Sequence, residues 1–186
     1  ETGMVAFYKL SLLGTRPVVQ LNNNPLKIGK LPSAGQFSPD GKHYLITDLG
    51  DREKPGRLLA IRCDFRQGGK HGLTGYASVG TNPGAFAISP DGKSVVILNK
   101  GISPSIDPPS DLSNTTSLQL IERDPVSGKL NVLQSLPYEG IAPQVVQFSE
   151  DQNMIAVLSL KVRDQEAGAI DFFRLNDSQL IPSSDL

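Results

Sequence analysis

Phe37-Ser38-Pro39-Asp40-Gly41-Lys42 is a short stretch that returns twice in the chain. Ile88-Ser89-Pro90-Asp91-Gly92-Lys93 repeats it almost letter for letter, and Phe148-Ser149-Glu150-Asp151-Gln152-Asn153 is a degenerate third copy. Each copy lies between two apolar runs. Proline presets φ for a turn, aspartate can bond its own backbone, and glycine accepts a positive φ, so the stretch predicts a tight turn between antiparallel strands. A hairpin that recurs along the chain indicates a repeat architecture.

A second signal follows the same interval. Pro32, Pro83 and Pro143 each stand at the same distance before the first residue of a turn motif. Apolar runs predict two early strands, 4–10 and 17–21, with 22–25 breaking the pattern. The later strands, four to a unit, are expected at 34–38, 43–48, 58–64 and 73–79; at 85–89, 94–99, 117–123 and 130–136; and at 145–149, 154–160, 169–175 and 179–182. No window shows sustained helical spacing of apolar residues, so almost no helix is expected.

Four strands in each unit of about 40–50 residues are typical of β-propeller blades. The predicted fold is therefore all-β, with about three and a half blades. They are a partial blade over 4–31 and blades over 32–82, 83–142 (with an inserted loop at 101–116) and 143–186. A β-sandwich is the alternative, but it would not predict repeat signals that move together. Propellers close with about 4–8 blades, so we expect a second half-propeller, either another copy or the remaining fragment of the same parent, to complete a ring.

Composition excludes several classes of protein. The 186 residues carry a formal net charge of −1 and 20% are charged, which does not favour a nucleic-acid partner. No apolar run approaches the roughly 18 residues of a membrane span. Cys63 is the single cysteine and is expected to be an unpaired, buried thiol. No motif for a metal site or a cofactor is present.

Two features bear on location. Residues 1–3, Glu1-Thr2-Gly3, resemble a remnant of secretion-vector cloning. Asn114 and Asn176 each begin a triplet that fits the N-glycosylation pattern. Both features favour an extracytoplasmic protein, secreted or periplasmic.

Several stretches resemble the seven-bladed lactonase-like propellers, which include propeller-type 6-phosphogluconolactonases and carboxy-cis,cis-muconate cyclases. They are Phe37 to Gly50 with Leu58 to Arg62, Asn82-Pro83-Gly84, and Ser89 to Lys93. The resemblance implies hydrolysis or cyclisation of a sugar lactone or a related small organic acid at the mouth of the central channel. A non-catalytic propeller that binds a protein or glycan partner through its long loops is the alternative. A redox quinoprotein-like propeller is a third, without a cofactor signal in this chain.

The chain departs from the family at one place. Members often carry Arg-His just after the proline that opens a blade, where this chain has Ser33-Ala34, Gly84-Ala85 and Gln144-Val145. Lactone chemistry needs a proton donor or acceptor and a group that stabilises the developing negative charge. The family's catalytic residues therefore cannot be assigned to this chain.

The order of strands in a blade predicts which face holds a site. The connections from the second strand to the third are long and polar, and long loops on a rigid frame tend to carry function. Ligand or partner contacts are therefore expected among the charged residues of 48–57, 99–116 and 161–168. These are Asp48, Asp51, Arg52, Glu53, Lys100, Arg163, Asp164 and Glu166. Solvated surface ion pairs of little energetic value are the alternative.

Two further predictions concern other parts of the chain. The insertion at 101–116 is either a loop that covers a partner or substrate, or a tolerated insertion. His43 and His71 are the only histidines. Neither has a catalytic or metal-binding partner at a recognisable spacing, so both are expected at the surface.

Overall fold

The computed structural model describes residues 2–51, 55–66, 68–101, 116–162 and 167–183. Within these residues the chain is all-β and contains no helix, hence none that could cross a membrane. An N-terminal hairpin of two strands is followed by three four-stranded antiparallel sheets. The predicted fold class, a partial β-propeller, is confirmed.

Each sheet is a meander of consecutive strands, which is the arrangement of a propeller blade. The N-terminal hairpin consists of β1 (Met4–Leu13) and β2 (Arg16–Lys27). The first blade consists of β3 (Pro32–Phe37), β4 (His43–Asp48), β5 (Pro55–Arg62) and β6 (Gly72–Thr81). The second consists of β7 (Pro83–Ile88), β8 (Ser94–Asn99), β9 (Ser117–Arg123) and β10 (Leu130–Pro137). The third consists of β11 (Gly140–Phe148), β12 (Met154–Val162), β13 (Ala169–Asn176) and β14 (Gln179–Pro182).

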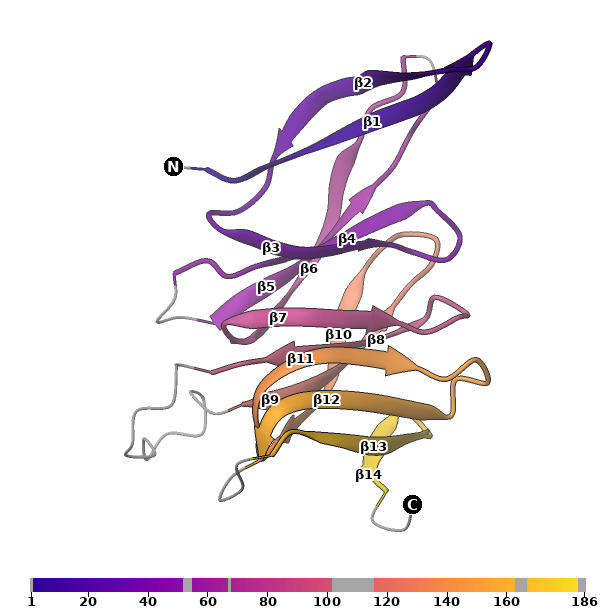
Figure 1. Ribbon diagram of the computed structural model, residues 1–186. Coiled ribbons are helices and arrows are strands. Elements are labelled where there is room, and N and C mark those ends of the chain that lie inside the picture. Colours follow the sequence, from indigo (N-terminus) through magenta and orange to yellow (C-terminus); the bar gives the residue numbers. More distant parts are fainter. Residues whose placement is uncertain (1, 52–54, 67, 102–115, 163–166, 184–186) are drawn as a thin grey trace.

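The units stack face to face in chain order, from the hairpin at one end to the third blade at the other (Figure 1). Strand β7 contacts both β3 and β11, so the first strands of the three blades lie beside one another. In a closed propeller this is the side of the central channel. We therefore call β3, β7 and β11 the inner strands.

Stacking explains why the second strands are so apolar. A strand that is covered on both sides needs apolar residues at successive positions, whereas a half-exposed strand alternates. Val95–Leu98 of β8 are each 0% exposed, whereas the outermost strand β10 alternates between covered and exposed residues. The continuous run and the alternation together place β8 in the middle of the molecule.

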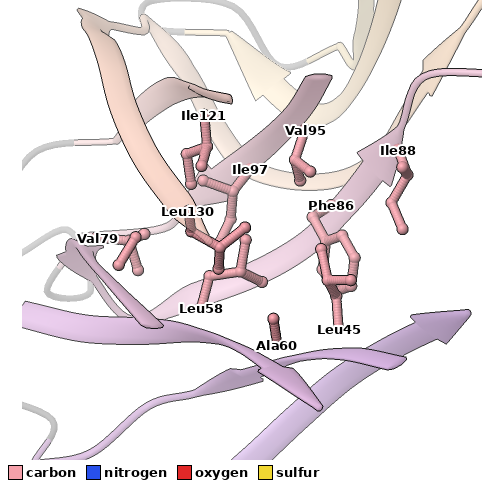
Figure 2. Packing of buried hydrophobic residues seen from close by; sticks show 11 residues of the cluster. Leu45, Leu58, Ala60, Val79, Phe86, Ile88, Val95, Ile97, Ile121 and Leu130 are labelled. Atoms are coloured by element: carbon pink, nitrogen blue, oxygen red, sulfur yellow. The ribbon is translucent and has the colours of Figure 1, made fainter. Parts of the chain in front are cut away.

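The apolar cores lie between the blades. Leu45 and Leu58 of the first blade pack against Phe86 and Ile97 of the second (Figure 2). A second cluster joins the second and third blades, and a third joins Phe7 of the N-terminal hairpin to the first blade. Each blade is therefore stabilised chiefly by its neighbours.

The repeated motif forms the predicted turn between the first two strands of each blade. Ser38 Oγ donates to Asp40 Oδ1 at 2.6 Å and accepts the N–H of His43 at 3.0 Å, while Gly41 adopts φ +67°. The second copy has the same contacts. The third lacks proline and glycine, yet Ser149 still bonds Asp151 at 2.5 Å. The pairing of serine with aspartate defines the turn more than proline does.

The predicted break at 22–25 is wrong, because β2 continues to Lys27. Asn23 adopts φ +63°, and the register between β1 and β2 shifts between Val5 and Phe7. Asparagine tolerates this left-handed conformation. Polar residues that predicted the end of a strand thus form a bulge within it.

Candidate functional site

Each blade has two ends. The turn face carries the Ser-Asp turns and the β9–β10 connection at Asp124–Lys129. The loop face carries the ends of β4, β8 and β12 and the connections between blades. Of the residues predicted to contact a ligand, those that the structure describes, Asp48, Asp51 and Lys100, lie at the loop face.

The second strand of each blade carries one buried polar residue toward the loop face. Asp48, Asn99 and Ser159 stand at the same distance after the turn aspartate of their own blades. Each of the three is 0% exposed. Buried polar groups are costly unless they are bonded, so their partners show what they do.

Asp48 binds the chain that enters the first blade. Its Oδ1 accepts the backbone N–H of Lys30 at 3.0 Å and of Leu31 at 2.8 Å, and also that of Gly50 at 3.2 Å. Its Oδ2 accepts Arg57 Nη2 at 2.6 Å. Burial by itself would raise the pKa of Asp48, but the hydrogen bonds outweigh burial and hold this pKa below its usual value.

Asn99 takes part in an amide network between the first and second blades. Gln119 Oε1 accepts Asn99 Nδ2 and the backbone N–H of Gly80, both at 2.9 Å. Gln119 Nε2 donates to Ser135 Oγ at 2.8 Å. Because Gly80 belongs to β6 and Gln119 to β9, these bonds hold neighbouring blades together.

Ser159 has the same role between the second and third blades. Tyr138, in the connection between β10 and β11, places its hydroxyl 2.8 Å from Ser159 Oγ and donates to Asp171 Oδ2 at 2.5 Å. Burial and this bond to Asp171 raise the pKa of Tyr138 well above its usual value, so the hydroxyl stays protonated. The Tyr138 hydroxyl is therefore a hydrogen-bond donor that ties the connection between β10 and β11 to the third blade, and it is unsuited to act as a base at neutral pH.

Lys100 differs from the fully buried Asp48, Asn99 and Ser159 because its side chain is only half-buried. A Cβ atom at Gly84 would lie 2.9 Å from Lys100 Cε, so the lysine stem lies against the inner strand β7. The backbone N–H of Lys100 donates to the carbonyl of Asn82 at 3.1 Å. Lys100 is thus a cationic side chain beside the inner strand β7 at the loop face.

The other candidate residues divide into two groups. Asp51 is exposed on the connection after β4, and Asn176 is exposed at the end of β13. The rest lie outside the described residues: Arg52, Glu53, Asn114, Arg163, Asp164 and Glu166. Most of the insertion at 101–116 also lies there.

The inner strands carry neutral residues near the loop face. Ser33 and Gln144 are exposed, whereas Gly84 is buried and Ala85 half-buried. Within the described ranges, no three His, Cys, Asp or Glu residues gather closely enough to hold a metal ion. The described inner positions therefore supply polar contacts but no acid or base.

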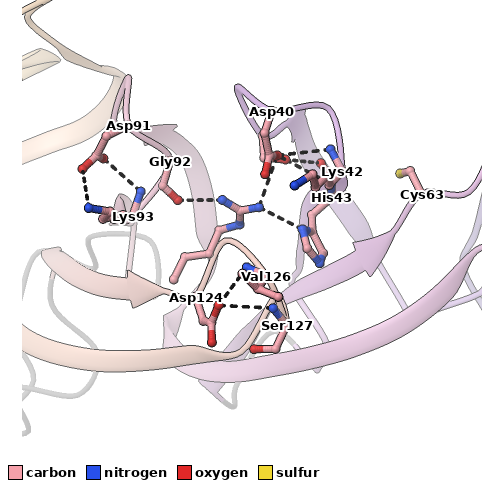
Figure 3. A network of polar contacts seen from close by, with 12 residues as sticks. Asp40, Lys42, His43, Cys63, Asp91, Gly92, Lys93, Asp124, Val126 and Ser127 are labelled. Carbon is pink, nitrogen blue, oxygen red and sulfur yellow. Dashed lines mark hydrogen bonds and ion pairs between the residues drawn. The ribbon is translucent and has the colours of Figure 1, made fainter.

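The prediction that His43 lies at the surface is wrong, because it is 1% exposed between the first and second blades. Arg123 Nη2 donates to His43 Nδ1 at 2.8 Å, and Arg123 Nη1 donates to the carbonyl of Gly92 at 2.7 Å (Figure 3). Asp40 Oδ1 lies 3.5 Å from Arg123 Nη2. Since Nδ1 accepts, the ring is neutral with its proton on Nε2. His43 begins a strand beside a turn, but Arg123, at the end of β9 in the next blade, covers its side chain.

Acid should weaken this interface. Burial lowers the pKa of His43 below 6.5, and the charge of Arg123 lowers it further. The other charged groups that act on the ring are Asp40, which raises its pKa, and Lys42 and Arg62, which lower it. A depressed native pKa means that the unfolded chain takes up the proton first, so stability is lost as pH falls below 6.5.

This loss is measurable as the free energy of unfolding in urea at pH 7, 6 and 5. The His43→Gln variant keeps an acceptor for Arg123 but cannot titrate. Its free energy of unfolding should therefore fall less steeply with decreasing pH, and the two slopes should differ by up to about 1.4 kcal/mol per pH unit. Equal slopes for the two proteins would contradict the assignment.

His71 is also buried, at 7% exposed, which corrects the second prediction of a surface histidine. Its Nδ1 accepts the backbone N–H of Asp64 at 3.1 Å, its Nε2 lies 2.8 Å from Asn22 Oδ1, and its ring packs 4.5 Å from that of Phe7. The N-terminal hairpin thus covers it. Cys63 is free and half-buried, and burial raises the pKa of its thiol to about 11.

Solved structures share this fold at low sequence identity. A functionally unknown protein from Desulfotomaculum acetoxidans superposes with a TM-score of 0.69 at 13% identity, over 98% of this chain and 51% of its own. A putative 6-phosphogluconolactonase from Bacteroides uniformis gives 0.67 at 16% identity, over 96% and 47%. A periplasmic gluconolactonase from Pseudomonas aeruginosa gives 0.59 at 15% identity, over 97% and 56%.

These likenesses confirm the resemblance to lactonase-like propellers at the level of the fold. The chain spans about half the length of the solved structures it matches. No family model and no curated protein matches the sequence.

Proposed function

We propose that this chain is part of a seven-bladed, lactonase-like propeller that binds a sugar lactone or a related small organic acid at the loop face. The support is the position of Lys100, half-buried against the inner strand β7 at Gly84. Neighbours of the same fold are described as a putative 6-phosphogluconolactonase and a gluconolactonase. An ammonium group there suits a ligand that carries or develops a carboxylate.

A binding propeller without catalysis is the second candidate. It is favoured by the neutral residues of the described inner strands, which include Ser33 and Gln144 and offer no proton donor or acceptor of suitable strength. Its partner would be a protein or glycan held by the loop face. An extracytoplasmic location is part of both proposals, supported by the periplasmic neighbour and the exposed Asn176.

The test is calorimetric titration with gluconate as the acid and glucono-1,5-lactone as the lactone. The Lys100→Ala variant should bind gluconate about 10- to 150-fold more weakly, because a charge-assisted hydrogen bond is worth about 1.5–3 kcal/mol. Lys129→Ala removes an exposed lysine from the turn face and should bind as the wild type does.

The two candidates differ in turnover. Hydrolysis of a panel of aldonolactones that Lys100→Ala slows and Lys129→Ala does not would support the lactonase. Gluconate binding without turnover would favour the binding propeller. Wild-type affinity in Lys100→Ala, or no binding of either compound, would refute the assigned site.

A further inference from the structure

The second blade differs from the other two at the loop-face end of its second strand. Leu49 and Leu160 follow the buried polar residue of this strand in the first and third blades, whereas Lys100 follows it in the second. The backbone N–H of Leu49 donates to the carbonyl of Leu31 at 2.9 Å. That of Lys100 donates to the carbonyl of Asn82 in the same way, at 3.1 Å. The second blade therefore places a charge where the repeat has a leucine.

The inner strand of the second blade carries a matching change. Ser33 on β3 and Gln144 on β11 stand at the same distance before the turn aspartates of their blades, and β7 has Gly84 at this position. An added Cβ on Gly84 would lie 2.9 Å from Lys100 Cε and 3.7 Å from Lys100 Cδ, so the lysine stem covers the glycine. A larger side chain would occupy the same space. The two changes together place the ammonium group, one bond beyond Cε, at the inner strand β7.

Nothing else in the described structure requires a glycine at this position. Gly84 does not adopt a positive φ, so its backbone conformation suits any residue. Apart from Lys100, the nearest atom to an added Cβ is the carbonyl oxygen of Leu98 at 3.7 Å, which is an ordinary contact. Gly56 differs, because an added Cβ there would lie 2.4 Å from Pro83 Cγ of the next blade. A glycine within a strand weakens the strand and often marks the close approach of another group, and at Gly84 that group is the lysine stem.

We infer that Gly84 is a positioning residue for Lys100. It leaves room for the lysine stem to lie across β7, and the ammonium group is thereby held where the carboxylate of the ligand binds. The inference rests on the proposed function, in which Lys100 meets an acid group. A lysine loses rotamer freedom when it is held in one direction. A stem that is already packed against the strand has lost part of this freedom before the ligand arrives, which favours binding.

Calorimetric titration of the Gly84→Ala variant with gluconate tests this inference. The added methyl group displaces the lysine stem, so gluconate should bind about tenfold more weakly, at the lower end of the loss expected for Lys100→Ala. The variant should fold as the wild type does, because only the flexible end of Lys100 has to move. Circular dichroism and urea unfolding check the fold. Gly72→Ala is the matched control: an added Cβ there has no atom within 4 Å, and its affinity should be that of the wild type.

A double-mutant cycle separates positioning from a general disturbance of the site. In the Lys100→Ala background the methyl group at position 84 has no lysine to displace, so Gly84→Ala should weaken gluconate binding no further. Glucono-1,5-lactone is neutral and carries no carboxylate, so its affinity should be the same for Gly84→Ala as for the wild type. Both results would show that the glycine acts through the charge of Lys100.

The outcomes separate this inference from the proposed function. If Lys100→Ala binds gluconate as the wild type does, the proposed site is refuted and the inference with it. If Lys100→Ala binds more weakly and Gly84→Ala does not, the proposed function stands and the inference is overturned. Additive losses in the double variant, or equal losses for gluconate and the lactone, would also overturn it, because the methyl group would then act on the site directly.

Discussion

Replacement of Gly128 by alanine should destabilise the protein by about 2–5 kcal/mol. Gly128 adopts φ +75°, where a side chain costs about 1–2 kcal/mol. An added Cβ would also lie 2.5 Å from Thr74 Oγ1 and 2.6 Å from His43 Nε2, and overpacking of this kind adds about 1–3 kcal/mol. Urea unfolding at pH 7 measures the loss.

Gly41→Ala is the matched control for this prediction. Gly41 has φ +67°, but an added Cβ would have no atom within 4 Å, so only the backbone cost of about 1–2 kcal/mol applies. The difference between the two variants therefore isolates the contact between the β9–β10 connection and the first blade. Equal destabilisation would mean that His43 and Thr74 can move aside, and that this interface is not tightly packed.

Replacement of Asp48 by alanine should cost about 3–5 kcal/mol, because three backbone N–H groups lose their acceptor and each buried group left unsatisfied costs about 1–3 kcal/mol. Arg57 is 42% exposed and can turn to water. Most of the loss should come from the N–H groups of Lys30, Leu31 and Gly50, which lose their acceptor. Because the native pKa of Asp48 is lowered, its stabilisation is present at neutral pH and is lost as pH falls below 3.8.

Urea unfolding at pH 7 measures this effect, with Glu139→Ala as the control. Glu139 is an exposed carboxylate in the connection between the second and third blades, and its removal should change the free energy of unfolding by no more than about 0.5 kcal/mol. An Asp48→Ala protein of wild-type stability that no longer binds gluconate would contradict the linking role. Asp48 would then be a ligand residue.

The repeat allowed much of the fold to be predicted from sequence. Strands expected at 43–48, 94–99 and 117–123 coincide with β4, β8 and β9. Their turns and apolar runs are local, so a single sequence suffices to locate them. β11 begins at Gly140, earlier than the predicted 145, because its first residues pair with β12 across an irregular register that residue type does not reveal.

The site was harder to predict, because burial depends on the neighbouring blade. Asp48 was expected in a ligand loop, whereas the structure places it under the chain that enters the first blade. Asn99 and Ser159 were overlooked, although counting from the turn aspartates would have found both. His43 was misplaced for the same reason: its cover is Arg123, which lies far along the chain. No local sequence pattern predicts the roles of Tyr138 and Asp171.

The stacking of sheets has a consequence for how the molecule opens. A stack in which each unit touches only its neighbours unfolds as a one-dimensional cooperative array. The second blade is covered on both sides and can separate only by exposing two cores, whereas the N-terminal hairpin and the third blade each give up one. Among the described units the second blade should therefore open last, and the amides of β8 should exchange with solvent most slowly.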